Sequence, residues 1–219
     1  MNVSEQALRE ELARTLQLMS ERGLNRGTSG NASVRLGSGM LITPSGIVPE
    51  KLGAESMVLI DAQGESAGPL KPSSEWRMHA GILEQRPDIN AVVHCHSRYA
   101  TILACAGKPI PAVHYMVAVS GRQQIPVAPY HAFGSKELAA AVVETLSGGF
   151  ACLMANHGQI VCAGSLGRAL SIAEEVEEQA AVYWGALAIG GPNLLTEEQM
   201  ENVLRRFRDY GQARAPRKP

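Results

Sequence analysis

The stretch Ala91-Val92-Val93-His94-Cys95-His96 decides how the chain is organised. Its apolar and β-branched residues follow a turn signal at Pro87, a pattern typical of a buried strand. Side chains alternate along a strand, so His94 and His96 point to one side and Cys95 to the other. Burying two imidazoles at the end of such a strand costs free energy of folding unless their nitrogen atoms have a binding partner. The pattern favours a metal site, with a pair of solvated or hydrogen-bonded histidines as the alternative.

Composition sets wide limits on the class of protein. Of 219 residues, 45% are hydrophobic and 19% are charged, and the formal net charge is −1. A balanced charge predicts neither nucleic-acid nor membrane binding, and no apolar run approaches the length of a membrane span. The charged N-terminus is unlike a secretory signal, and no cysteines form a Cys-x-x-Cys pair, so we expect a cytoplasmic protein. The apolar contexts of Cys95, Cys105, Cys152 and Cys162 predict that all four are core residues.

Apolar periodicity and turn residues predict the elements. Helices are expected at 4–22, 73–86, 97–106, 135–146, 165–189 and 196–210, the second with a serine cap. Strands are expected at 32–36, 40–43, 57–61, 91–96, 124–128, 150–154 and 159–162. Because helices do not alternate regularly with these short strands, we expect an α/β fold. It is a single domain over residues 1–219, with a central mixed, largely antiparallel sheet layered by helices. Neither nucleotide-binding glycine motif occurs.

Two further residues complete a candidate ligand set. Glu75 opens a helix directly before the histidine strand, and His157 lies in a tight turn between two buried strands. A catalytic metal site needs protein ligands and one open position. An ion held there polarises a carbonyl, and a glutamate released from the ion regains basicity. The remaining histidines, His79, His114 and His131, are expected to be hydrogen-bonded or surface groups.

Three polar loops offer a second half of a site. Residues 27–31, 43–46 and 72–74 supply hydroxyls and unpaired backbone N–H groups, and such loops bind phosphate without lysine or arginine. Each alone is usually only a turn, so the prediction depends on their converging on the metal. A lysine Schiff base is disfavoured, because no lysine lies inside a predicted buried strand.

Several separated motifs, in the same order, resemble those of the zinc-dependent (class II) sugar-phosphate aldolases, and within them the branch that acts on L-fuculose 1-phosphate. The motifs are GLNRGTSGN at 23–31, MLITPSGI at 40–47, PSSEWR at 72–77, AVVHCH at 91–96, IPAVHYM at 110–116 and ANHG at 155–158. The resemblance covers nearly the whole chain. It departs from the family pattern at Cys95, which replaces a polar residue, and at Ala155-Asn156, which replace a more histidine-rich approach to His157.

The resemblance implies a class II aldolase/adducin-like fold, with residues from about 207 to 219 as a mobile tail. It implies one Zn²⁺ per subunit, with Mn²⁺ or Co²⁺ as alternatives, in a homotetramer with active sites at the subunit interfaces. Glu75 becomes a ligand and the catalytic acid/base, and Tyr115 of a neighbouring subunit protonates the aldehyde oxygen. The implied residues are, for the metal, Glu75, His94, His96 and His157; for the phosphate, Thr28, Gly30, Asn31, Ser45, Gly46, Ser73 and Ser74; and for the aldehyde side, Phe133, Phe207 and Tyr210.

The implied reaction is the reversible cleavage of a ketose 1-phosphate such as L-fuculose 1-phosphate. The products are dihydroxyacetone phosphate and a small aldehyde such as L-lactaldehyde. The second hypothesis is an aldolase for 5-deoxyribulose 1-phosphate or 5-methylthioribulose 1-phosphate in nucleoside by-product salvage. A pentulose-phosphate 4-epimerase or a methylthioribulose-1-phosphate dehydratase is expected to need an acid in segment 116–125, which contains none. A non-enzymatic adducin-like module would be expected to lose the metal ligands, and all four are present.

Overall fold

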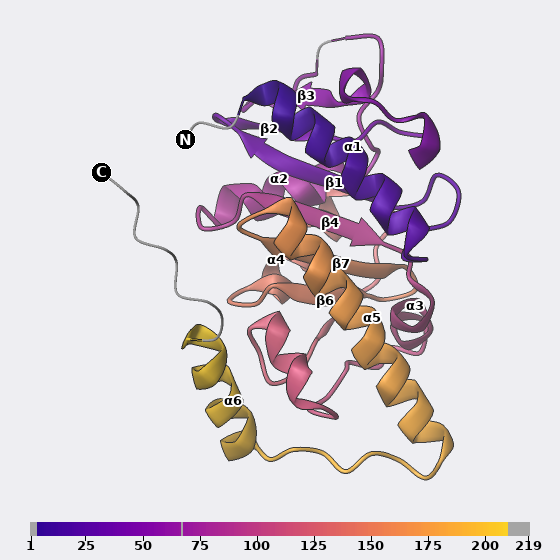
Figure 1. Ribbon diagram of the computed structural model, residues 1–219, viewed down its shortest axis with the longest axis vertical. Helices are drawn as coiled ribbons and strands as arrows, with labels where there is room; N and C mark the ends of the chain where they lie inside the picture. The colour runs from indigo at the N-terminus through magenta and orange to yellow at the C-terminus, as the bar shows by residue number, and fades with distance from the viewer. Residues whose placement is uncertain (1–3, 67, 210–219) are drawn as a thin grey trace.

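A seven-stranded sheet runs through the middle of the molecule. The computed structural model describes residues 4–66 and 68–209. The sheet order is β3-β2-β1-β4-β7-β6-β5 (Figure 1). The strands are β1 Asn31–Leu36, β2 Gly39–Ile42, β3 Val58–Ile60, β4 Ala91–Cys95, β5 Val127–Ala128, β6 Ala151–Met154 and β7 Gly158–Ala163. Only the β5–β6 pair is parallel among these strands, which confirms the predicted mixed, largely antiparallel sheet.

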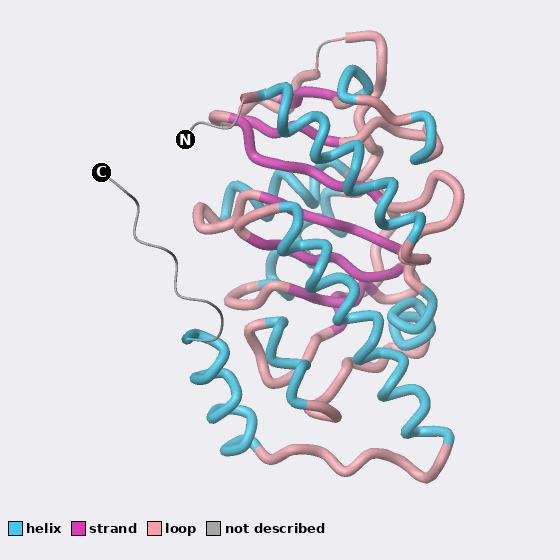
Figure 2. Tube along the Cα trace, viewed as in Figure 1, coloured by secondary structure: helices cyan, strands magenta, loops and turns pink. Residues whose placement is uncertain are grey.

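Helices cover both faces of the sheet. They are α1 Glu5–Glu21, α2 Trp76–Gln85, α3 Arg98–Cys105, α4 Lys136–Leu146, α5 Leu166–Ala188 and α6 Glu197–Asp209, with 3₁₀ turns η1 Pro49–Lys51, η2 Ala54–Ser56 and η3 Tyr115–Ser120. Helices α1 and α5 cover one face and α2 and α4 the other, while α6 lies apart from the sheet, beside η3 (Figures 1 and 2). In the part of the chain that the structure describes, no helix is long and apolar enough to cross a membrane.

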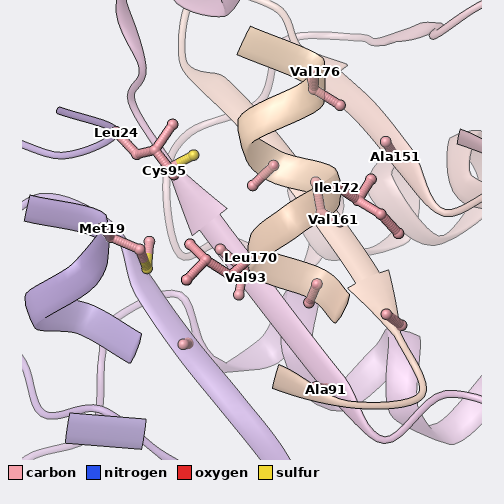
Figure 3. Close-up of a cluster of buried hydrophobic side chains, with 14 of the residues drawn as sticks. Met19, Leu24, Ala91, Val93, Cys95, Ala151, Val161, Leu170, Ile172 and Val176 are labelled. Carbon is pink, nitrogen blue, oxygen red and sulfur yellow. The ribbon is translucent and has the colours of Figure 1, made fainter. Parts of the chain in front are cut away.

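Strand β4 lies at the centre of the sheet and is buried on both faces. Val93 and Cys95 pack between α1 and α5, close to Met19 and Leu170 (Figure 3). Val92 packs on the opposite face, in the cluster that α2 and α4 supply. A strand that is covered on both faces has a continuous apolar sequence, and this is why residues 91–96 could be predicted as a buried strand. Because side chains alternate, His94 projects to the α2 side, away from the neighbouring cysteine.

Two local predictions are wrong. Cys105 is exposed, because it is the last residue of α3 and one side of this surface helix faces solvent even though its sequence is apolar. The predicted serine cap of α2 is also absent: the capping position belongs to Glu75, whose side chain makes no capping bond because it turns inward to Asn31. At the other end of the chain, residues 207–209 continue α6, and Tyr210 lies outside the described residues.

Candidate metal centre

Three histidines from two parts of the sheet converge on one point. His94 is the penultimate residue of the buried strand β4, His96 follows two residues later, and His157 occupies the turn between β6 and β7. Antiparallel pairing sets Cys95 of β4 opposite Gln159 of β7, which carries the turn to the end of β4. One ligand atom from each ring lies within 4.8 Å of the others. Sheet pairing thus brings together His94 and His157, which are 63 positions apart in the sequence (157 − 94).

Glu75 joins these histidines from the start of α2. Its Oε2 lies 3.2 Å from Nε2 of His94, and its Oε1 lies 3.2 Å from Nε2 of His157. The carboxylate is buried, with a residue exposure of 8%. The four residues that the sequence singled out as a ligand set therefore lie together.

The hydrogen on His94 can be assigned from its surroundings. Nδ1 lies 2.8 Å from the backbone carbonyl oxygen of Gln159, which only accepts, so Nδ1 carries the hydrogen. Nε2 then presents its lone pair towards the carboxylate of Glu75 and towards Nε2 of His96, which is 3.0 Å away. Electron-rich atoms this close need a shared proton or a cation between them. Nitrogen and oxygen donors of this kind, with a hydrogen-bonded histidine, fit Zn²⁺.

The protonation states agree with this assignment. Burial, together with the charge of His94 and against the opposing effect of Glu75, lowers the pKa of His96 and of His157 to about 4. Burial also lowers the pKa of His94, but the adjacent Glu75 carboxylate and the hydrogen bond to the Gln159 carbonyl together outweigh burial and raise it. For Glu75, burial raises the pKa, while His94, His157 and the amide of Asn31 lower it by more. In the ion-free protein the raised pKa of His94 favours a proton at the place that suits a cation, beside His96 and His157 with lowered pKa values and an ionised carboxylate.

A chain of buried polar residues lies behind Glu75. Nδ2 of Asn31 donates to Oε2 of Glu75 at 3.0 Å. Oδ1 of Asn31 is 2.6 Å from Nε2 of His79, whose Nδ1 is 2.8 Å from Oγ of Ser33. Sequence reasoning expected His79 to be hydrogen-bonded or at the surface, and it did not connect this histidine with the site. The available signal was the spacing of Glu75 and His79, one helical turn apart.

The predicted phosphate loops lie side by side next to Glu75. Pro44 and Pro72 form a β-bridge, in which the N–H of Ser45 donates to Lys71 O and the N–H of Ser73 to Thr43 O, both at 3.0 Å. Thr43 in turn bonds Ala32, next to Asn31. These bonds bring the three loops together beside Glu75. The bridge nevertheless uses the N–H groups of Ser45 and Ser73, which the sequence had suggested were unpaired.

The remaining predicted phosphate residues sit on these loops with different exposures. Asn31 and Ser73 are buried, Gly30 is half-buried, and Thr28, Ser45, Gly46 and Ser74 are exposed. Gly30 adopts a φ of +76°, and a Cβ at this position would meet the side chain of Asn25 at 2.3 Å. The exposed hydroxyls are the groups of this set that a ligand from solvent reaches directly.

A pocket of about 300 Å³ opens beside the histidines. It is lined by Ser74, Glu75, His96, Tyr130, His131, Phe133, Asn156 and His157. Phe133 lies at this pocket, and the residue is 74% exposed. Tyr130 and His131 were missed, although an aromatic cluster just before a helix was a usable signal.

Two other predicted residues lie away from this pocket within one chain. Tyr115 begins η3 and is 49% exposed. Together with Phe207 of α6 and Arg168 of α5, it lines a separate pocket of about 860 Å³. That pocket is larger, but its lining contains none of the four candidate ligands.

Comparison with known proteins gives consistent matches over nearly the whole chain. The family model described as Class II Aldolase and Adducin N-terminal domain matches residues 10–184. A 5-methylthioribulose-1-phosphate/5-deoxyribulose-1-phosphate aldolase of Rhodospirillum rubrum is 48% identical over 205 residues, covering 94% of this chain and 93% of the relative. An L-fuculose phosphate aldolase of Escherichia coli (strain K12) is 45% identical over 208 residues, covering 93% and 97%. A solved L-fuculose 1-phosphate aldolase aligns with a TM-score of 0.89 and 40% identity, covering 92% of this chain and 96% of that one.

Proposed function

Because the chain belongs to the class II aldolase family, a family of lyases, we propose that it cleaves a ketose 1-phosphate reversibly into dihydroxyacetone phosphate and a small aldehyde. One observation carries the proposal. Glu75 meets His94, His96 and His157 at a pocket bordered by convergent hydroxyl-bearing loops. This arrangement supports a site that binds a cation and a phosphate and in which Glu75 transfers a proton.

We assign Glu75, His94, His96 and His157 as the residues that hold one Zn²⁺ per subunit, with Mn²⁺ and Co²⁺ as alternatives. The tautomer of His94 and the buried Oε1 of Glu75, which has no hydrogen-bond partner, support this assignment. When bound, such an ion polarises the substrate carbonyl and stabilises the negative charge that develops beside it.

The chain's own residues then handle protons and orientation. In the cleavage direction, Glu75 delivers a proton to the C3 carbon of the departing dihydroxyacetone phosphate. Tyr115 of a neighbouring subunit exchanges a proton with the aldehyde oxygen. The phosphate lies among Thr28, Gly30, Asn31, Ser45, Gly46, Ser73 and Ser74, and the aldehyde faces Phe133, Phe207 and Tyr210. The convergence of the three loops beside Glu75 supports the phosphate assignment.

The preferred substrate in this proposal is L-fuculose 1-phosphate, which releases L-lactaldehyde. The L-fuculose phosphate aldolases at 45% identity support it. A second candidate is 5-deoxyribulose 1-phosphate or 5-methylthioribulose 1-phosphate, favoured by the Rhodospirillum rubrum relative at 48% identity. The exposed rings of Tyr130 and Phe133 at the pocket suit an apolar aldehyde end, which both candidates have.

A coupled assay for dihydroxyacetone phosphate tests the proposal. Purified protein of measured zinc content is supplied with the 1-phosphates of L-fuculose, L-rhamnulose, 5-deoxyribulose and 5-methylthioribulose. We expect release of dihydroxyacetone phosphate, with the highest kcat/KM for L-fuculose 1-phosphate. A higher kcat/KM for a 5-substituted ribulose 1-phosphate would favour the second candidate. No release from any of them, with zinc bound, would contradict aldolase activity on ketose 1-phosphates.

The proposal includes a cytoplasmic homotetramer with active sites between subunits. Tyr115 is half exposed and lies outside the histidine pocket of its own chain, which supports a role in a neighbouring subunit. The four free cysteines support a reducing compartment.

A further inference from the structure

We infer that His79 is a positioning residue that locks the Asn31 amide, so that Asn31 anchors one oxygen of Glu75 and leaves the other oxygen for the chemistry. The inference rests on the proposed role of Glu75 as ligand and acid/base. It assigns a purpose to a histidine that is neither among the residues lining the pocket nor one of the three clustered imidazoles.

The four hydrogen-bonded residues Asn31, Ser33, Glu75 and His79 face one another from strand β1 and the start of helix α2. Asn31 and Ser33 are two apart on β1, so their side chains point to the same side of the sheet. Glu75 and His79 are four apart at the start of α2, so they lie on the same side of the helix. Their exposures are 4% for Asn31, 0% for Ser33, 8% for Glu75 and 0% for His79. Buried polar groups of this kind depend on one another for hydrogen bonds.

The direction of every hydrogen bond follows from the ionised carboxylate. A carboxylate only accepts, so Asn31 directs its NH₂ group to Glu75 and its Oδ1 to His79. Oδ1 also only accepts, so His79 carries its hydrogen on Nε2, and its Nδ1 accepts from the hydroxyl of Ser33. Burial and the nearby charge of His94, against the opposing effect of Glu75, lower the pKa of His79 to about 3, which agrees with the neutral ring that this pattern requires.

The reverse orientation of the amide would place Oδ1 of Asn31 against the Glu75 carboxylate, so that two acceptors would face each other. The carboxylate therefore sets which end of the amide it meets. The Nε2–H of His79 holds the other end of the amide in place. Ser33 hydrogen-bonds the second nitrogen of the ring and so keeps the imidazole in position towards Asn31.

The consequence is that the two oxygens of Glu75 are unequal. Oε2 is held by Asn31, whereas Oε1 is buried without a hydrogen-bond partner and faces Nε2 of His157 at 3.2 Å. We assign the proton transfer to Oε1. Asn31, for which the family resemblance implies a phosphate contact, has only its second N–H left for that purpose.

The test compares three variants with a control. His79→Phe keeps a ring and removes both hydrogen bonds, and Ser33→Ala removes only the hydrogen bond to Nδ1 of the imidazole. His79→Gln keeps an N–H donor in a similar place and serves as the conservative variant. Thr15→Val removes a buried hydroxyl from α1, remote from the site, and controls for a loss of stability.

Three measurements are made: zinc affinity of the metal-free protein by chelator competition, the ¹⁵N spectrum of the His79 imidazole, and kcat and KM on the best substrate of the coupled assay. We expect a neutral Nε2–H ring in the wild type. His79→Phe should lower zinc affinity and kcat by about 10- to 100-fold with little change in KM. Ser33→Ala should lower zinc affinity and kcat by a smaller factor than His79→Phe. His79→Gln should retain most of the zinc affinity and most of the kcat of the wild type.

A wild-type His79 with its hydrogen on Nδ1, or protonated at neutral pH, would overturn the inference. So would His79→Phe and Ser33→Ala proteins whose zinc affinity matches that of the Thr15→Val control. The zinc and ¹⁵N measurements need no substrate. They therefore decide the role of His79 even if the wild type cleaves none of the four ketose phosphates.

Discussion

Glu75 has two proposed tasks that place opposite demands on its pKa. Burial raises the pKa of its carboxyl group, but His94, His157 and Asn31 lower it by more, so the group stays ionised beside the imidazoles. An ionised carboxylate is a good ligand and a poor base. Moving away from the positive charge would raise the pKa and restore basicity, which makes Glu75 suited to both tasks in turn.

Glu75→Gln is the most direct test at the scale of one residue. The substitution keeps the size of the side chain and removes its charge and its proton-carrying ability. We expect release of dihydroxyacetone phosphate to fall by about 10²- to 10⁴-fold, measured in the coupled assay with zinc content determined in parallel. Glu84→Gln, an exposed site on the same helix, is the matched control and should behave like the wild type. Full activity of a zinc-loaded Glu75→Gln protein would show that the acid/base role is wrong.

At the scale of elements, the β6–β7 hairpin positions His157 against the end of β4. Asn156, just before this histidine, has a φ of +56°, the single positive φ of a non-glycine residue among the described residues. Gly158, just after it, lies so close to β4 that a Cβ would meet the carbonyl oxygen of Cys95 at 2.5 Å and Cδ2 of His96 at 3.0 Å. The hairpin therefore holds two of the candidate ligands, His96 and His157, in one fixed arrangement.

Gly158→Ala should separate these two elements. The added methyl group meets backbone, so β7 has to move away from β4 and carries His157 with it. We expect zinc affinity to fall by about tenfold or more, and the free energy of unfolding in urea to fall by about 1–3 kcal/mol. Gly164→Ala, just beyond the other end of β7, adds its Cβ to open space and should change neither. Equal zinc affinities of the two variants would contradict this account of the hairpin.

At the scale of the whole molecule, a buried neutral histidine ties stability to pH. The pKa of His79 is lowered from 6.5 to about 3 in the folded protein by burial and by the charge of His94, while Glu75 opposes the shift. Below pH 6.5 the unfolded chain takes up a proton that the folded chain does not. The contribution of His79 is therefore fully present above about pH 6.5 and is lost as the pH falls towards 3.

Urea unfolding between pH 7 and pH 4, with chelator present throughout, measures this dependence. The free energy of unfolding of the wild type should decrease with acidification, by a few kcal/mol from His79. His79→Gln should show a smaller decrease, because glutamine does not titrate. A wild-type and a variant protein with the same pH dependence would show that His79 is not the group responsible.

Subunit complementation tests the assembly. Glu75→Gln and Tyr115→Phe proteins should each be impaired in the cleavage reaction. When the two are co-expressed, mixed assemblies contain sites that combine the intact Glu75 of one subunit with the intact Tyr115 of its neighbour. We expect activity well above that of either variant, together with a tetrameric mass by light scattering. No recovery in mixed tetramers would show that Tyr115 does not serve a neighbouring site.

Much of the fold and the candidate site was predictable from local sequence. Alternation along β4 set His94 and His96 on one side, and helix and turn signals placed Glu75 and His157 at the ends of elements. These properties depend on residues a few positions apart, so they can be inferred without knowing how the elements pack. The same local logic failed for Cys105, because an apolar stretch does not reveal which side of a helix is covered.

The sequence by itself determined the elements, the type of sheet and the identity of four residues suited to a metal. Only the tertiary structure decided that Asn31 reaches Glu75 across 44 positions, that His79 lies behind them, and that Tyr115 lies outside the histidine pocket. The physical reason is that these facts are contacts between elements far apart in the chain. Such contacts arise only when the sheet is paired and helix α2 is packed against it.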